Sequence, residues 1–376
     1  SYRLYARYSS YDNGYSPDSS HDDWHIGQTG VRADWGQDSR DAFTLQGDFY
    51  QGESGEQVSI PTGTAGPPPT TIRTRDDDTD LEGGNLLFRW SRLLSDNSGF
   101  ALQAYFDYVD REEVVLNEDR NTLDVDFQHH FRLQNRHDIL WGAGYRYIED
   151  DTRNNPTFSL QPDNRDFQLV SAFIQDAIDL NDDVQLTIGS KFEHNDFTGF
   201  EYQPSARIAW AADNGQTLWS AVSRAVRTPS RGEHDVRLRL VPDPAMDPGI
   251  PVYAVGDDDY DSEEMIAYEL GYRLNYHNNW SVDLATFYNR YDDLRTLDIS
   301  SAGPTGVLLP FDNRMDGDTW GIELAGQWQV RPGWRINGSY NYLNMSLDLD
   351  SSSTDTQSQG AGDASPSHQA SLWSTY

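Results

Sequence analysis

Residues 318–330 read DTWGIELAGQWQV, and this stretch decides the fold. In an extended strand, successive side chains point to opposite faces, so residues two apart share a face. One face here carries Trp320, Ile322, Leu324, Gly326, Trp328 and Val330, and the other carries Gly321, Glu323, Ala325, Gln327 and Gln329. The stretch therefore predicts a strand with one apolar face and one polar face.

The same alternation recurs along the whole chain. It is clear in residues 264–277, 138–147 and 333–342, whereas residues 167–179 carry apolar side chains on both faces and leave the inward face unassigned. We expect sixteen strands, at residues 1–10, 23–36, 41–52, 80–93, 99–111, 119–133, 137–150, 166–180, 183–195, 200–212, 216–227, 261–277, 280–297, 318–330, 333–349 and 367–376.

The segments between these strands alternate in length. The short ones, 37–40, 95–98, 134–136, 181–182, 213–215, 278–279 and 331–332, are mostly rich in Asn, Asp and Gly, which suit tight hairpins. The others are mostly long, at 11–22, 53–79, 151–165, 228–260, 298–317 and 350–366, with two short exceptions at 112–118 and 196–199. Outer-membrane barrels have short periplasmic turns and long extracellular loops. The pattern predicts an all-β fold, a transmembrane antiparallel β-barrel whose strand 1–10 runs outward.

Composition is compatible with this interpretation. The chain has 376 residues, a net charge of -33, no cysteine and a mean hydropathy of -0.74. No run of about 18 apolar residues is present, which excludes membrane-spanning helices, but barrel strands turn only half of their residues to lipid. The acidic charge disfavours nucleic acid as a partner. Trp and Tyr favour membrane interfaces, and we expect a girdle that includes Trp90, Trp141, Trp210, Trp280, Trp320 and Trp334.

Several segments, in order, also resemble a known family. Residues 223–231 (SRAVRTPSR) are similar to the RAxRxPS segment of TonB-dependent outer-membrane receptors, and 268–273 (YELGYR) with 280–297 resemble the strand pair that follows it. Residues 172–176 with 186–193 resemble an upstream pair, and 367–373 (SHQASLW) resemble a downstream strand start. The family-motif residues are Arg224, Arg227, Pro229 and Arg231.

The resemblance implies a barrel of about 22 strands plugged by an N-terminal domain. Residues 1–376 would then be one barrel segment, with the plug, the TonB box and the last strands outside it, and with unpaired edges at its first and last strands. It implies a receptor of the ferric siderophore type, located in the bacterial outer membrane, with the TonB system, outer-membrane lipid and lipopolysaccharide as partners. It implies no cofactor and no enzymatic activity.

Alternatives remain open at this point. The barrel could be a passive porin or an adhesive barrel, or a receptor for cobalamin, haem, a copper chelate or an oligosaccharide. A soluble β-sandwich or propeller is a third class. Retention of solubility without detergent would favour that third class over a membrane barrel.

The sequence contains little that resembles an active site or a metal site. Ser54 lies in GESG without a strand-to-helix elbow, so it is not expected to be a nucleophile. His129 and His130 are adjacent on a strand and point to opposite faces, so they are not expected to share an ion. The aspartates of 76–80 and 257–259 lack the glycine-spaced pattern of a calcium loop and are interpreted as solvated charge.

Arginines are the candidate ligand residues. Arg224 and Arg227 lie in a predicted strand, where pairing with carboxylates inside the lumen is the favoured interpretation. Arg237, Arg239 and Tyr253 lie in a predicted long loop and are candidates for contact with an anionic ligand, because a guanidinium binds carboxylates in a bidentate manner. Lipopolysaccharide is an alternative contact for Arg237 and Arg239.

Overall fold

The computed structural model of the protein describes residues 1–15, 21–37, 39–62, 71–212, 215–240, 251–276, 279–303 and 306–376. No helix within these ranges is long and apolar enough to cross a membrane. The predicted turns at 213–214 and 278 and the Pro-rich segment 63–69 lie outside the described residues.

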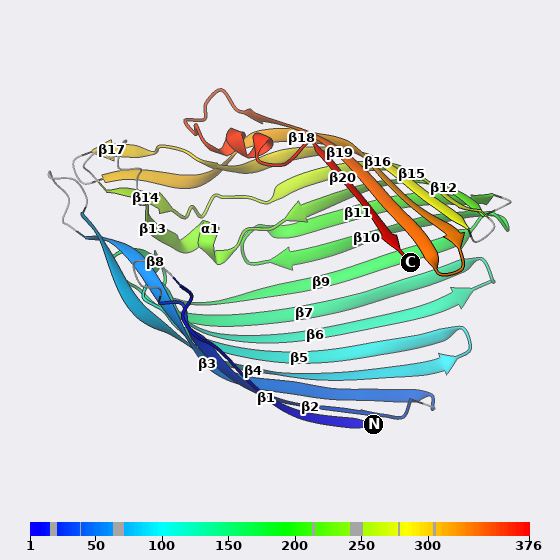
Figure 1. Ribbon diagram of the computed structural model, residues 1–376, viewed down its shortest axis with the longest axis horizontal. Helices are drawn as coiled ribbons and strands as arrows, with labels where there is room; N and C mark the ends of the chain where they lie inside the picture. The colour runs from blue at the N-terminus through cyan, green and yellow to red at the C-terminus, as the bar shows by residue number, and fades with distance from the viewer. Residues whose placement is uncertain are drawn as a thin grey trace.

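The dominant feature is a single curved antiparallel wall (Figure 1). The described residues form twenty strands, and all but four short ones, β8, β13, β14 and β17, belong to the wall. The sixteen wall strands are β1 (Tyr2–Tyr11), β2 (Trp24–Trp35), β3 (Asp41–Thr62), β4 (Thr71–Ser95), β5 (Ser98–Glu112), β6 (Asn117–Leu133), β7 (His137–Arg153), β9 (Asn164–Asp179), β10 (Val184–Asn195), β11 (Gly199–Ala212), β12 (Gln216–Arg227), β15 (Glu263–Tyr276), β16 (Trp280–Leu297), β18 (Gly306–Arg331), β19 (Trp334–Leu349) and β20 (His368–Thr375). Each of them overlaps one predicted strand, so the predicted order of strands is confirmed.

The two ends of the wall differ as predicted. Short turns gather at the right-hand end of Figure 1, and the long connections gather at the left-hand end. Gln134 and Asn135 adopt φ values of 50° and 55° in the turn between β6 and β7, and Gly333 adopts 89° between β18 and β19. Such positive φ values are typical of tight hairpin turns, so these predicted short turns have the backbone conformation expected of hairpins.

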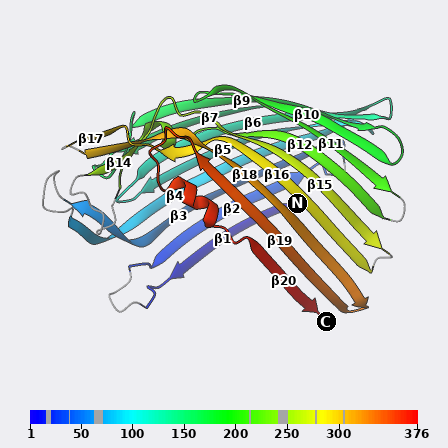
Figure 2. The same cartoon turned by 90° about the horizontal axis from the view of Figure 1, so that it is seen from above.

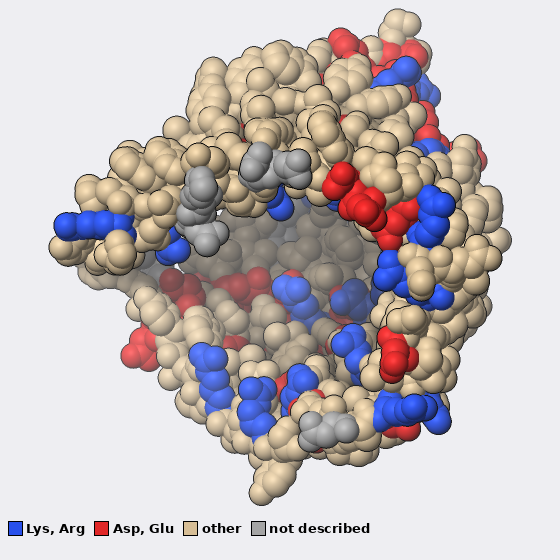
Figure 3. All heavy atoms as spheres, turned by 90° about the vertical axis from the view of Figure 1, so that its right-hand side faces the viewer, with Lys and Arg blue, Asp and Glu red and all other residues tan. Residues whose placement is uncertain are grey.

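The wall is open. Among the described residues, β1 pairs with β2 alone and β20 pairs with β19 alone, so both are edge strands, as predicted. Figure 2 shows the strands running obliquely, and Figure 3 looks from the short-turn end into the hollow, whose inner surface carries both basic and acidic side chains. The structure is thus a partial barrel with a polar interior.

The outward face is built of rows that cross the strands. Cross-strand partners have side chains on the same face, so the register defines each row. On β15 and its neighbours, from the short-turn end, the rows are Tyr276–Trp280–Trp328, then Leu274–Val282–Gly326, Tyr272–Leu284–Leu324, Leu270–Thr286–Ile322 and Tyr268–Tyr288–Trp320. Leu270 and Leu324 are 50% and 41% exposed, and no second protein layer covers them among the described residues. The expected outward apolar band is therefore confirmed.

Aromatic residues mark the short-turn edge of that band. Trp35 stacks on Phe43, with ring centroids 5.4 Å apart, and Phe43 stacks on Trp90 at 6.1 Å. The series continues through Phe100, Phe127 and Trp141 on β5, β6 and β7. The six predicted girdle tryptophans, Trp90, Trp141, Trp210, Trp280, Trp320 and Trp334, all lie in strands.

Four predicted loops are wrong in part. Residues 53–62 and 71–79 were expected to be loop, but β3 and β4 continue through them and pair with each other. Likewise β18 begins at Gly306 rather than at residue 318, and short strands occupy parts of 151–165, 228–260 and 298–317. Beyond the membrane both faces of a strand meet water, so pairing leaves no alternation of apolar and polar residues to detect.

Candidate functional site

The long-loop end carries a second, small sheet. It consists of β8 (Phe158–Leu160), β13 (Val236–Leu240), β14 (Val252–Val255), β17 (Ser301–Gly303) and the start of β18, and we call it sheet B. Leu160, Val236 and Ala254 are buried on one side of sheet B, at 8%, 8% and 3% exposure. Burial of this apolar side explains why such short strands are ordered.

The three predicted ligand residues lie together on sheet B. Arg239 pairs with Tyr253 across β13 and β14, and Arg237 is two residues from Arg239, so all three share one face. The Arg237 guanidinium carbon lies 4.0 Å from the centroid of the Tyr253 ring, and Arg237 is exposed. A guanidinium over a tyrosine ring, with a second arginine beside it, is suited to binding a planar anion.

Arg224 forms the predicted type of ion pair, but on the other side of the wall. It lies opposite Ile266 in the register and shares the outward face with Val222 and Tyr268. Its Nε lies 3.1 Å from Glu264, and its guanidinium carbon lies 4.4 Å from the Tyr202 ring centroid. The expectation that Arg224 pairs in the lumen is therefore wrong, because its even-numbered position on β12 turns it outward.

Arg227 joins several carboxylates at the outer end of the lumen. Its Nε and Nη2 each lie 2.8 Å from Glu263, which is a bidentate pair, and Nη2 also lies 2.8 Å from Glu233. The same Nη2 donates to the Tyr260 hydroxyl at 2.7 Å. Lumen pairing of Arg227, the favoured interpretation of the sequence, agrees with this geometry.

Arg231 lies in α1 (Arg231–Asp235), the short helix that follows β12. Its side chain is 7% exposed and pairs with Asp150 of β7 and with Asp235, whose Oδ2 lies 3.0 Å from its Nε. Asp235 in turn accepts from Arg165 of β9 at 2.6 Å. Pro229 is buried just before α1, where its missing N–H and fixed φ suit the exit from a strand.

We call Arg227, Arg231, Glu233, Asp235 and their partners Asp150, Arg165, Tyr260 and Glu263 the arginine cluster. Burial alone would raise the pKa of Glu233, but hydrogen bonds from Arg227 and Ser230 outweigh it and hold that pKa below its usual value. The pKa of Glu263 is lowered for the same reason, with burial opposed by the Arg227 pair. Burial raises the pKa of Tyr260 further above its usual range. Glu233 and Glu263 are therefore ionised at neutral pH, and Tyr260 is a neutral donor.

The sequence did not predict which acidic residues pair with the arginines of the cluster. Asp150 lies 81 residues before Arg231, and Glu263 lies 36 residues after Arg227. Nothing in the local sequence around Asp150 or Glu263 distinguishes them from the other acidic residues of this chain. The only available signal was the motif itself, since an arginine-rich segment in an acidic chain requires anionic neighbours.

A cavity of about 550 Å³ adjoins the cluster inside the wall. Arg120, Arg146 and Arg231 line it together with Phe158, Phe167 and Phe197. Arg146 is held by Asp124 at 2.7 Å, so the charges facing the cavity are largely paired within the wall. The cavity lies on the side of β8 that carries Leu160, away from the face of Arg237.

Metal-binding geometry does not occur in the described part of the chain. No group of three or more His, Cys, Asp or Glu side chains is arranged to hold an ion there. His129 faces outward, where it accepts from Trp141 Nε1 at 3.1 Å, and its neighbour His130 points to the other face. Asp78 pairs with His21 at 3.0 Å and Asp77 with Arg75 at 2.7 Å, as solvated charges would.

Comparison with known proteins identifies relatives of the fold. Residues 1–376 match the family model described as TonB dependent receptor-like, beta-barrel. None of the curated proteins matches the sequence. Family members are transporters and not enzymes.

Three solved structures illustrate the likeness. The siderophore receptor PirA from Pseudomonas aeruginosa is 17% identical, with a TM-score of 0.63 over 93% of this chain and 70% of that one. The copper transporter OprC is 15% identical, with a TM-score of 0.69 over 100% of this chain and 60% of that one. The hemophore receptor HasR from Serratia marcescens, solved with its hemophore and heme, is 12% identical, with a TM-score of 0.70 over 91% and 58%. The chain thus spans roughly three fifths of the length of two of these structures and 70% of the third.

Proposed function

Since the chain belongs to the TonB-dependent receptor family through its β-barrel, we propose that it is the wall of a receptor that imports a ferric siderophore. Proteins of this family lie in the outer membrane of Gram-negative bacteria, and the outward apolar rows of this chain match that location. Family membership favours an active receptor over a passive porin or an adhesive barrel.

The face of sheet B that carries Arg237, Arg239 and Tyr253 is the observation that supports a siderophore. It lies at the long-loop end, in a protein whose net charge is -33, so it is a local cationic surface in an acidic molecule. Ferric siderophores are often anionic and carry planar chelating groups, which match a bidentate guanidinium and an aromatic ring. An anionic chelate would be repelled by most of the surface and attracted here.

The wall does no bond chemistry in this proposal. It fixes the position of sheet B and surrounds a polar interior in which a plug domain would sit. The TonB system would act on that plug, so transport energy would enter through a part of the protein outside residues 1–376. The arginine cluster would hold the long-loop end rigid while the ligand binds.

Uptake by cells tests the proposal. A strain that lacks the gene, complemented with the full-length receptor, is grown under iron limitation and offered a ferric catecholate, a ferric hydroxamate, haem or a copper salt. We expect the deletion to abolish uptake of one iron chelate and the wild-type gene to restore it. Uptake of haem or copper in place of both chelates would reject the siderophore and retain the family.

Binding by variants tests the sheet B face. Loss of a charge-assisted hydrogen bond costs about 1.5–3 kcal/mol, so Arg237→Ala with Arg239→Ala should weaken binding by roughly 10- to 100-fold. Arg75→Ala is the matched control, because Arg75 is also an exposed arginine at the long-loop end, with its side chain 62% exposed. Equal affinity in all three proteins would place the ligand elsewhere.

A further inference from the structure

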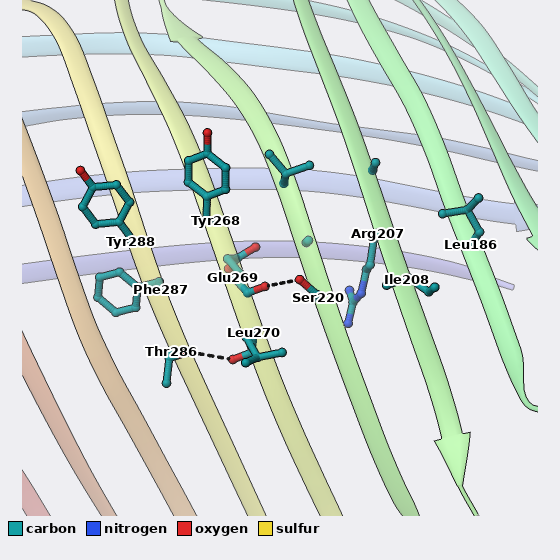
Figure 4. A pocket seen from close by; sticks show the side chains of 13 residues that line it. Leu186, Arg207, Ile208, Ser220, Tyr268, Glu269, Leu270, Thr286, Phe287 and Tyr288 are labelled. Atoms are coloured by element: carbon teal, nitrogen blue, oxygen red, sulfur yellow. Dashed lines mark hydrogen bonds between the residues drawn. The ribbon is translucent and has the colours of Figure 1, made fainter.

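The outward face of the wall carries a groove that the transport function does not use. Its volume is about 710 Å³, and it crosses β10, β11, β12, β15 and β16. Ala206, Ser220 and Thr286 are its small members, and the space above them is bounded by larger neighbours. These are Leu186, Ile208, Val222, Tyr268, Leu270 and Tyr288 (Figure 4).

The register shows that these side chains share one face. Ala206 pairs with Val222, Val222 with Tyr268, and Tyr268 with Tyr288. The next row, one step nearer the short turns, joins Ile208, Ser220, Leu270 and Thr286. Arg207 and Glu269 also border the groove, but their positions place them on the lumen face, where Arg207 lies 4.6 Å from the Trp219 ring centroid.

The groove is apolar although it contains two hydroxyl groups. Ser220 donates to the backbone oxygen of Glu269 at 2.9 Å, and Thr286 donates to that of Leu270 at 3.2 Å. Figure 4 shows both bonds directed back to the strands. A hydroxyl that is already bonded to the backbone leaves mainly carbon surface toward a ligand, so the groove suits hydrocarbon.

The position of the groove along the strands places it in the outer half of the membrane. It occupies the two of the five outward rows that lie nearest the long-loop end. The row beyond it contains Arg224, Ile266, Arg290 and Asp318, which is the charged level expected at a headgroup region. Arg290 has its side chain 63% exposed and uses Nε and Nη2 to bind Asp292, and a guanidinium carries five N–H donors in all.

We propose that this groove holds an acyl chain of lipopolysaccharide, with a phosphate of its headgroup at Arg290. The groove is continuous with the membrane-facing band, so its occupant is drawn from the lipid that already covers that band. Lipopolysaccharide fills the outer leaflet of this membrane and carries phosphate, whereas phospholipid fills the inner leaflet. Arginine binds phosphate in a bidentate manner, which fits the charged row above the groove.

Lipid retention tests the inference. The full-length receptor is extracted from outer membranes in mild detergent, and β-hydroxy fatty acids and phospholipid fatty acids are measured per mole of protein. Ala206→Leu with Ser220→Leu fills the groove. Ala143→Leu with Ala172→Leu is the matched control, because these two alanines are exposed partners on the outward face of β7 and β9, outside the groove.

We expect the groove variant to lose tightly bound lipopolysaccharide and the control to retain it. Arg290→Gln should lower lipopolysaccharide retention and make it less sensitive to salt, because the charge contact that salt screens in the wild type is absent from the variant. Equal retention in wild type and groove variant would overturn the inference, as would retained phospholipid in place of lipopolysaccharide. A wild-type dimer that the groove variant dissociates would assign the groove to a second copy instead. All of these outcomes are independent of which nutrient the receptor imports.

Discussion

The wall and the arginine cluster are stabilised in opposite ways. The wall turns Leu, Ile and aromatic side chains outward, where Leu270 and Ile188 are 50% and 44% exposed. The cluster turns charge inward, where Arg231 and Asp235 are 6% exposed. In the wall, lipid replaces the protein core as the apolar solvent. In the cluster, where sheet B supplies little apolar area, paired charges fix a short irregular segment across several strands.

This contrast predicts the largest effect for loss of Arg231. Removing one partner of a buried ion pair costs about 3–5 kcal/mol, since Asp150 and Asp235 are left buried and unpaired. Arg231→Ala should therefore open residues 228–240, which we would follow by hydrogen exchange of the full-length receptor. Arg237→Ala, an exposed arginine six residues away, should leave protection of this segment intact. Equal protection in both variants would show that the cluster does not stabilise the segment.

A charged side chain introduced into the outward rows should destabilise the wall and leave the arginine cluster intact. Leu324→Arg places a cation in the middle of the five rows, where the bilayer midplane adds about 2–4 kcal/mol. Ala325→Arg, the next residue, turns the same charge into the polar interior and should cost far less. Unfolding in lipid by urea and the amount of receptor in the outer membrane both report this difference. Similar losses in the two variants would contradict the assignment of faces.

Acid should loosen the cluster and spare the wall. The pKa values of Glu233 and Glu263 are lowered on folding, so their stabilisation is present above the unfolded value of about 4.3 and is lost as pH falls through the lower folded values. Glu233→Gln should cost about 1.5–3 kcal/mol at neutral pH and flatten the acid response, because a hydrogen bond to a charged group contributes that much. Hydrogen exchange of residues 228–263, corrected for its intrinsic pH dependence, measures both effects. Glu112→Gln, an exposed glutamate paired with Arg153, is the control.

The smallest expected effect has the opposite sign and lies at a short turn of the wall. Gln134 holds a φ of 50°, a conformation that is unfavourable by roughly 1–2 kcal/mol for residues other than glycine. Gln134→Gly should therefore stabilise the wall by less than about 1 kcal/mol, since glycine loses more backbone entropy on folding. Gly215→Ala is the counterpart, because φ is 75° there and the new Cβ would approach the Asn275 backbone oxygen to 2.3 Å. That variant should lower the urea midpoint that Gln134→Gly raises.

The sequence predicted the strands of the wall well and the structure of the long-loop end poorly, and the difference has a physical reason. Lipid on one side forces apolar residues such as Trp320, Ile322 and Leu324 to alternate, and that period is visible without any knowledge of partners. Sheet B and the extensions of β3 and β4 stand in water, and their order depends on partners such as Phe158 for Leu238 that only the folded chain supplies. Arg237, Arg239 and Tyr253, the predicted ligand residues, lie together on sheet B, and their role in ligand binding stays a prediction. The prediction for Arg224 is wrong, because Arg224 shares the outward face of β12 with Val222.

The long hairpin of β3 and β4 has a consequence at the cell surface. Residues 53–62 of β3 and 71–79 of β4 continue past the expected wall strands as a paired ribbon of about ten residues on each side. At about 3.3 Å per residue this ribbon extends up to roughly 30 Å farther from the membrane. Water covers both faces of this ribbon, so substitutions in it meet fewer packing constraints than substitutions in the lipid-facing band, and its sequence should vary more among homologues.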